Sequence, residues 1–197
     1  MDILEPQTGA EDRLPIFSPI FPMLPPTEQQ IRVWPDPILN KISMPINKEF
    51  GTPELQQLII DMFHTMRLNK GVGLAAPQLG ISKRVITMEV EPNKLVYFIN
   101  PIFIDVSETM YKWEEGCLSV PGYFEFRERP NDINVWTNDM NGNLLEVRLQ
   151  GLYAFALQHE VDHLAGKVFV DDLSPFKKDR VKGKIKKTLR NRVRSPL

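Results

Sequence analysis

The chain has 197 residues, of which 42% are hydrophobic and 25% charged, and its formal net charge is −1. This composition is typical of an ordinary globular protein of one domain, not of a disordered or fibrous chain. It has no apolar run near the roughly 20 residues of a membrane span and no basic segment followed by an apolar run at its start, so neither membrane contact nor a secretion signal is expected. The only cysteine, Cys117, cannot form an internal disulfide, which favours a reducing, cytoplasmic location.

The N-terminal residues 1–30 contain six prolines, which predict an extended or irregular arm rather than a domain. A helix is then expected from Pro53, because Thr52 can cap it and the apolar residues that follow have helical spacing. It should end before Gly71. The segment 71–80, GVGLAAPQLG, is predicted as a loop of small residues and has no phosphate-binding glycine pattern.

Residues 83–149 are rich in β-branched and aromatic residues and predict mainly strands, with a hairpin turn at Asn141-Gly142. A helix is expected over 151–164, ended by Gly166, and a final helix over 175–192. The predicted fold class is therefore α+β, with antiparallel sheets around a central helix.

Charge is concentrated at the C-terminus. From Ser174 onward the chain has ten Lys and Arg and one acid, a net charge of +9, so the remaining residues sum to −10. A basic tail on an acidic body favours an anionic partner. The same charges also fit a solvated helix face, and both interpretations stay open.

The helix over 151–164 contains the motif QHEVDH, in which His159 and His163 are four residues apart. Residues at this spacing lie on one face of a helix, so both imidazoles can bind one metal ion. Glu160 projects to the side and can reach a water at the ion without displacing a ligand. The alternative is a buried helix with two hydrogen-bonded histidines.

The third ligand is less clear. Phe169 occupies the position where one class of zinc peptidases has a histidine, and no glutamate follows Glu160. Asp171 and Asp172 remain as weak candidates, and His64 lies on a distant helix. Cys117, in the segment EEGCLS, would complete a thiolate and two imidazoles with an open fourth position, as in catalytic metal sites. A lone cysteine by itself is more often a small buried residue.

Three segments resemble the motifs of the peptide deformylase family, in the same order and with similar spacing: GVGLAAPQ (71–78), EGCLS (115–119) and QHEVDHLAG (158–166). The resemblance extends over about residues 31–192. It implies the deformylase α+β fold, with a catalytic domain at 31–174 and a basic C-terminal helix at 175–197. The implied reaction is hydrolytic removal of the formyl group from the formyl-methionine of new polypeptides.

The resemblance also implies roles for individual residues. One ion, most often Fe(II) in this family, would be bound by Cys117, His159 and His163, and Zn(II), Ni(II) or Co(II) fit the same ligands. Glu160 would act as general base and acid. The Gln78 side chain and the backbone N–H of Leu118 would stabilise the oxyanion.

Substrate contacts are expected from a further set of residues. Gly71, Val72 and Gly73 could pair with an extended peptide, and Val72, Leu152, Phe155 and Ala156 match or adjoin the methionine pocket. Glu115 is also expected at the substrate site, and Glu115 and Arg129 are expected to form ion pairs, with Asp162 as a further partner, that either support a metal ligand or stabilise the fold. Phe124 is a departure, because many bacterial members have an arginine there.

Two other functions compete with this interpretation. One is a zinc endopeptidase that uses His159, His163 and Asp171 or Asp172. The other is a binding module whose basic C-terminal helix docks on ribosomal RNA or another polyanion, with steep salt dependence. The resemblance makes ribosome contact compatible with deformylase activity.

Overall fold

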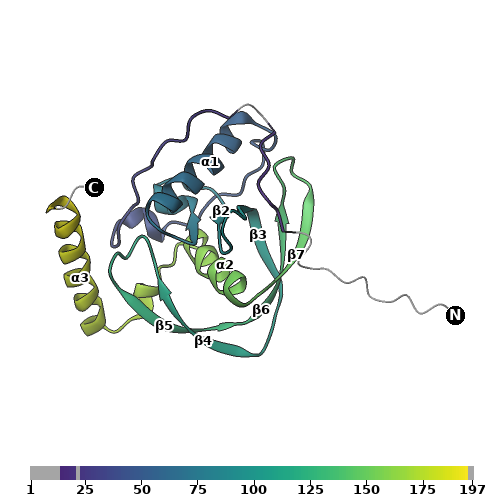
Figure 1. The fold of residues 1–197 in the computed structure, drawn as a ribbon. Coiled ribbons are helices and arrows are strands. Elements are labelled where there is room, and N and C mark those ends of the chain that lie inside the picture. The colour runs from purple at the N-terminus through teal and green to yellow at the C-terminus, as the bar shows by residue number, and fades with distance from the viewer. Residues whose placement is uncertain (1–13, 21–22, 195–197) are drawn as a thin grey trace.

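The structure, a computed structural model, describes residues 14–20 and 23–194. Much of the predicted arm, and residues 195–197 of the tail, thus lie outside the described residues. Helix α2 (Gly151–Leu164) lies in the middle of the molecule, with the strands curved around it and α1 (Pro53–Leu68) on the other side, as Figure 1 shows. The predicted α+β fold is confirmed. None of the helices in the described part is long and apolar enough to cross a membrane.

The strands form two antiparallel sheets. The larger has the order β1-β2-β3-β6-β7, with bounds Gly73–Ala75, Val85–Met88, Val96–Val106, Asp132–Asn138 and Leu144–Gln150. The smaller pairs β4 (Met110–Gly116) with β5 (Phe124–Pro130). Strand β1 ends the larger sheet, and β4 has one neighbour only. Both strands therefore leave one backbone edge unpaired within the described chain.

Helix α1 forms for the reasons that the sequence indicates. Thr52 Oγ1 accepts a hydrogen bond from the N–H of Leu55 at 3.3 Å, and Pro53 occupies the first turn. This satisfies an N–H that has no partner within the helix. One face of the helix packs against β1 and β2, and Ile59 and Met62 on this face are fully buried.

Helix α2 is buried on most of its surface. Phe155, Leu157 and Leu164 are each at most 5% exposed, and they pack in or beside the core of the larger sheet. The helix ends at Leu164, and Gly166 shortly after it has a φ of 72°, which suits glycine best. Because the helix lies inside the protein, polar residues on it face the interior, including both histidines.

The described part of the arm packs along the body. The N–H groups of Ile20 and Gln29 donate to Gln56 Oε1 (2.7 Å) and Thr65 Oγ1 (2.9 Å) of α1. Further on, the N–H of Arg32 donates to the carbonyl of Gln78 (2.7 Å), and the Trp34 N–H to that of Ser119 (2.8 Å). The chain at 32–34 thereby ties together the segments around Gln78 and Cys117.

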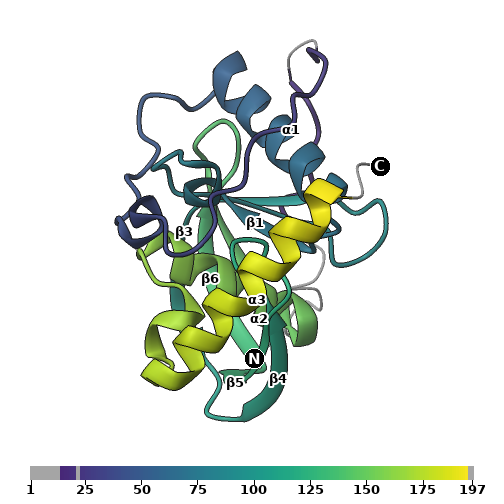
Figure 2. The ribbon, with the colours of Figure 1, turned by 90° about the vertical axis from the view of Figure 1, so that its left-hand side faces the viewer.

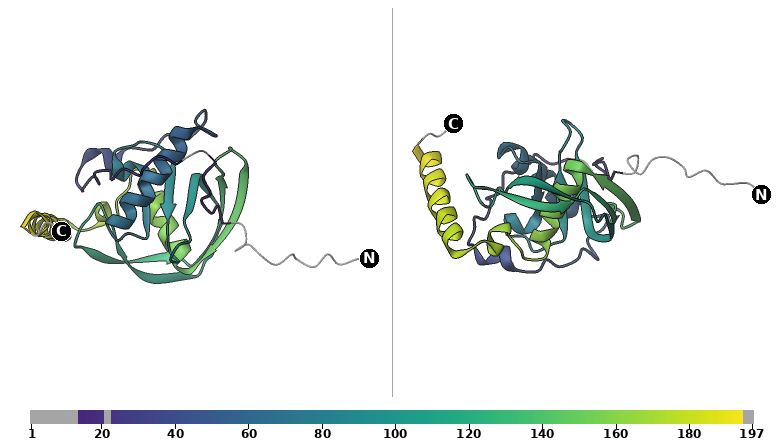
Figure 3. Two further views of the ribbon diagram at one scale, coloured as in Figure 1. Left: turned by 45° about the horizontal axis from the view of Figure 1, so that its top comes forward. Right: turned by 90° about the horizontal axis from the view of Figure 1, so that it is seen from below.

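Helix α3 (Pro175–Arg194) lies on the outside of the body, as Figures 2 and 3 show. Val181 is fully buried and Ile185 is 7% exposed, and both belong to a core cluster with Val120, from the loop after β4. A Cβ added to Gly122 of the same loop would collide with Thr188 Oγ1. The C-terminal helix is thus packed on the loop that also contains Cys117.

Candidate metal centre and substrate cleft

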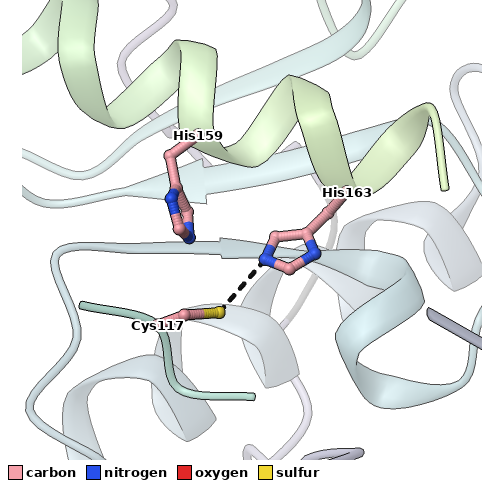
Figure 4. Close-up of side chains that lie close together, drawn as sticks. All are labelled: Cys117, His159 and His163. Atoms are coloured by element: carbon pink, nitrogen blue, oxygen red, sulfur yellow. Dashed lines mark hydrogen bonds between the residues drawn. The ribbon is translucent and has the colours of Figure 1, made fainter. Parts of the chain in front are cut away.

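Three candidate metal ligands converge at the centre of the fold. Cys117 directly follows β4, and His159 and His163 lie one turn apart on α2. Their donor atoms all lie within 4.8 Å of one another. In Figure 4 both imidazoles extend from α2 toward the thiol, and Cys117 Sγ is 3.2 Å from His163 Nε2. Cys117 and the two histidines are far apart in the sequence, and the fold brings them together.

The residues present fit a transition-metal ion. A soft thiolate with two imidazoles is a donor set that Fe(II), Zn(II), Ni(II) and Co(II) accept, and it leaves a position open for water. Oε2 of Glu160 and Nδ1 of His163 are buried without a hydrogen-bond partner in the described chain. An unpaired buried polar atom is costly, so the orphaned carboxylate oxygen indicates that the site is built for an additional polar occupant.

His159 is held by a buried charge network. Its Nδ1 lies 3.0 Å from Glu115 Oε2, and Glu115 also accepts from the guanidinium of Arg129, which bonds Asp162 at 2.9 Å. Burial opposes the ionisation of Glu115, but hydrogen bonds from His159 and Arg129 outweigh it and lower its pKa to about 2. An ionised carboxylate only accepts, so Nδ1 of His159 donates and its Nε2 is free for an ion.

Glu160 lies next to the donors and is 5% exposed. Burial raises its pKa to about 7, against the opposing effect of His159. Its carboxylate lies next to β1, because a Cβ added to Gly73 of this strand would be 2.6 Å from Oε1. A buried carboxylate with one free oxygen can exchange a proton with a group in the site.

Gln78 has a fixed orientation. Its Oε1 accepts from the N–H of Ala75 at 2.8 Å, and its Nε2 donates to Ser119 Oγ at 3.2 Å and lies 3.5 Å from Cys117 Sγ. The side-chain N–H group thus points toward the metal donors. Ser119, fully buried, was not singled out from the sequence, although it ends the quoted EGCLS segment.

A cleft of about 440 Å³ opens beside these groups. Every substrate residue expected from the sequence lines it, as does Leu118: Gly71, Val72, Gly73, Glu115, Leu152, Phe155 and Ala156. Sequence reasoning missed Trp113, which stacks on Phe155 with ring centroids 5.4 Å apart. The signal was the strand alternation, since Trp113 lies two residues before Glu115 and so on the same face of β4.

The aspartates of the endopeptidase hypothesis are used elsewhere. Asp171 accepts hydrogen bonds from Trp34 Nε1 and Asn40 Nδ2, and Asp172 pairs with Arg127. Within the described residues, the cluster of possible metal donors contains neither of them. The hypothesis of an aspartate as the third ligand is therefore wrong.

A Cys-His-His donor set, a buried carboxylate and an adjoining apolar cleft define a metal-dependent hydrolase. The family model described as polypeptide deformylase matches residues 28–179. A peptide deformylase of Cellvibrio japonicus is 43% identical over 163 residues, which cover 82% of this chain and 95% of that protein. The chain therefore belongs to the polypeptide deformylase family, and it removes the formyl group from the N-terminal methionine of formylated peptides.

Solved structures give the same result. The crystal structure of a peptide deformylase from Legionella pneumophila has a TM-score of 0.80 and 38% identity, and covers 86% of this chain and 100% of that one. The enzyme of Ehrlichia chaffeensis in complex with actinonin has a TM-score of 0.74 and 42% identity, over 82% and 97% of the two chains.

Proposed function

We propose that the enzyme binds one Fe(II) ion through Cys117, His159 and His163 and uses Glu160 for proton transfer. The observation that carries the proposal is the convergence of the three donor atoms within 4.8 Å, beside a carboxylate with an unpartnered buried oxygen. When bound, the ion supplies a Lewis acid that makes water nucleophilic near neutral pH. Zn(II), Ni(II) and Co(II) suit the same donors, so metal analysis decides between them.

In this proposal Glu160 has two tasks. It accepts the proton of the attacking water and later delivers it to the amine that leaves as the formyl C–N bond breaks. Its position on α2, directly after His159, keeps the carboxylate beside the reacting carbon. Gly73 leaves free the space that the carboxylate occupies, since a Cβ on this residue would lie 2.6 Å from Oε1.

Two N–H groups are assigned to the oxyanion that develops on the formyl oxygen. The first is Nε2–H of Gln78, which the bond from Ala75 N–H to Oε1 keeps turned toward the site. The second is the backbone N–H of Leu118, next to Cys117. Donors that are already oriented stabilise the developing charge without reorganisation in the transition state.

The peptide is proposed to bind as an added strand. The unpaired edges of β1 and β4 both border the cleft, through Gly73 on one side and Gly116 on the other. An extended chain between them can form backbone hydrogen bonds to either edge. The methionine side chain then enters the apolar part of the cleft, formed by Val72, Trp113, Leu152, Phe155 and Ala156.

The test is formate release from a formyl-Met tripeptide by protein loaded anaerobically with Fe(II). Glu160→Gln should retain the fold and the metal and lose nearly all activity. Glu128→Gln, a change of the same kind at an exposed position of β5 that does not line the cleft, should remain active. A Glu160→Gln variant with full activity would contradict the assignment of the base.

We also propose that α3 contacts the ribosome, in the cytoplasm where new chains carry formyl-methionine. Lys186 and Arg190 are exposed on this helix, and such contacts to phosphates weaken steeply with salt. The double variant Lys186→Glu, Arg190→Glu should reduce co-sedimentation with ribosomes and leave tripeptide hydrolysis unchanged. Co-sedimentation equal to that of the native enzyme at every salt concentration would contradict it.

A further inference from the structure

A second cavity, of about 310 Å³, lies between α3 and the loop after β4 and is strongly basic. It is lined by Tyr123, Arg180, Gly183, Lys184 and Lys187. The three cations follow the spacing i, i+4 and i+7, so they form one flank of the helix. In the described chain the salt bridges of α3 use Lys177 and Lys182 instead, so these three cations have no carboxylate partner there.

The basic cavity adjoins the substrate cleft. Tyr123 lines both cavities, and Gly122, which lines the cleft, lies so near α3 that a Cβ added to it would collide with Thr188 Oγ1. The burial of Val181 and Ile185 against Val120 holds the helix in this position. The basic flank is therefore a fixed part of the cleft's surroundings.

The carboxylate of Glu125, which lies near this cavity, already has partners of its own. Glu125 accepts a hydrogen bond from Tyr123 Oη at 2.8 Å and pairs with Lys177 Nζ at 2.9 Å. It thus does not neutralise the cations that line the cavity. A concave surface with three unpaired cations attracts anions, and carboxylates or phosphates are the groups that Arg and Lys bind best.

A nascent chain is the anion source that this position favours. The formylated end of a substrate occupies the cleft at the metal donors, and the rest of the peptide has to leave past the cleft wall. We propose that Arg180, Lys184 and Lys187 form an exosite for acidic side chains that follow several residues after the formyl-methionine. The inference rests on the proposed course of the peptide between β1 and β4.

The exosite predicts a substrate preference that depends on peptide length. Two series of formyl-Met peptides with a neutral spacer would carry either a Glu pair or a Lys pair, moved stepwise away from the methionine. For the distant positions, the Glu peptides should have a kcat/KM about fivefold above the Lys peptides, the effect of one solvent-exposed ion pair. The difference should lie in KM, disappear at high salt, and be absent for a neutral tripeptide.

Charge reversal separates this site from the rest of the helix. Lys184→Glu with Lys187→Glu should abolish or invert the preference and leave tripeptide hydrolysis unchanged. The matched double variant Lys186→Glu, Arg190→Glu has the same change in net charge and should keep the preference. If the native enzyme does not hydrolyse the tripeptide at all, that result would count against the proposed catalytic site and not against the exosite.

Two results would overturn the exosite. One is equal kcat/KM of the native enzyme for acidic and basic peptides at every position. The other is loss of ribosome binding in the Lys184→Glu, Lys187→Glu variant with an unchanged peptide preference, which would assign the cavity to RNA.

Discussion

Gly73 and Glu160 lie so close that a Cβ on the glycine would be 2.6 Å from the Oε1 atom of the glutamate. The backbone of Gly73 does not have a positive φ, so its conformation does not require glycine. The requirement comes from the carboxylate, which needs the space above β1. One missing methyl group thus sets the position of the proposed general base.

Gly73→Ala should therefore impair catalysis more than folding. We expect kcat/KM for a formyl-Met tripeptide to fall about 100-fold, because displacing a catalytic group by about 1 Å costs that much. Gly183→Ala is the matched control, since a Cβ there has nothing within 4 Å and alanine favours the helix. Thermal unfolding of both variants would separate a displaced carboxylate from a damaged fold, and full activity of Gly73→Ala would exclude the displacement.

Local sequence signals predicted the regular elements well. The cap at Thr52, the turn at Asn141-Gly142 and the bounds of α2 depend on neighbouring residues only, and all three are confirmed. The segment 71–80, predicted as a loop, instead contains β1 and a short 3-10 helix at Ala76–Leu79. A strand of three residues is too short for a periodicity to be detected, and its pairing with β2 comes from the tertiary fold.

In the site, too, some features follow from neighbouring residues and others only from the tertiary fold. Histidines four residues apart on a helix share a face by geometry alone, so the motif was readable. Cys117 is distant in sequence, and its place beside them depends on how β4 packs on α2. Ser119 gave no separate signal, because buried serines are common, and for Trp113 the strand alternation indicated only that it shares a face of β4 with Glu115. Their proximity to Gln78 and Phe155 is visible only in the fold.

Glu115→Gln should weaken metal binding. The amide can still accept from His159, but the negative charge that polarises the imidazole and balances Arg129 is lost. Changes in groups that support a metal ligand typically cost 10- to 100-fold in metal affinity. Competition with a chelator would measure this, with Glu114→Gln as the exposed control on the same strand. Equal affinities would show that Glu115 only stabilises the fold.

The attachment of α3 predicts a stability effect. Ile185 is 7% exposed in the cluster that contains Val120, whereas Leu189 is 38% exposed. Ile185→Ala should lower the free energy of unfolding by about 2 kcal/mol or more, and Leu189→Ala by no more than about 1 kcal/mol. Urea unfolding measures both. Equal small effects would mean that the helix is not part of the core in solution. Because α3 contributes buried side chains, charge variants test its surface with less damage to the fold than deletions.

The proposed Fe(II) site predicts sensitivity to air. A thiolate-bound Fe(II) centre should lose activity as the iron or Cys117 is oxidised, whereas Zn(II)-loaded protein has no metal oxidation to undergo. Activity and the mass of the peptide that contains Cys117 can be followed together during exposure to air. Iron-loaded enzyme that stays fully active for days would remove the argument for iron as the working metal.

Substitution of Asp171 distinguishes a structural role of this residue from a role as a metal ligand. It accepts hydrogen bonds from Trp34 Nε1 (3.1 Å), Asn40 Nδ2 (3.1 Å) and the N–H of Val168 (2.9 Å). Asp171→Ala leaves these donors without their acceptor, so we expect a loss of about 2–4 kcal/mol in the free energy of unfolding. The metal content per folded chain should not change, because the donor set lies on Cys117, His159 and His163. Asp172→Ala removes one exposed ion pair with Arg127 and should cost no more than about 1 kcal/mol. A folded Asp171→Ala protein without metal would return this aspartate to the ligand set.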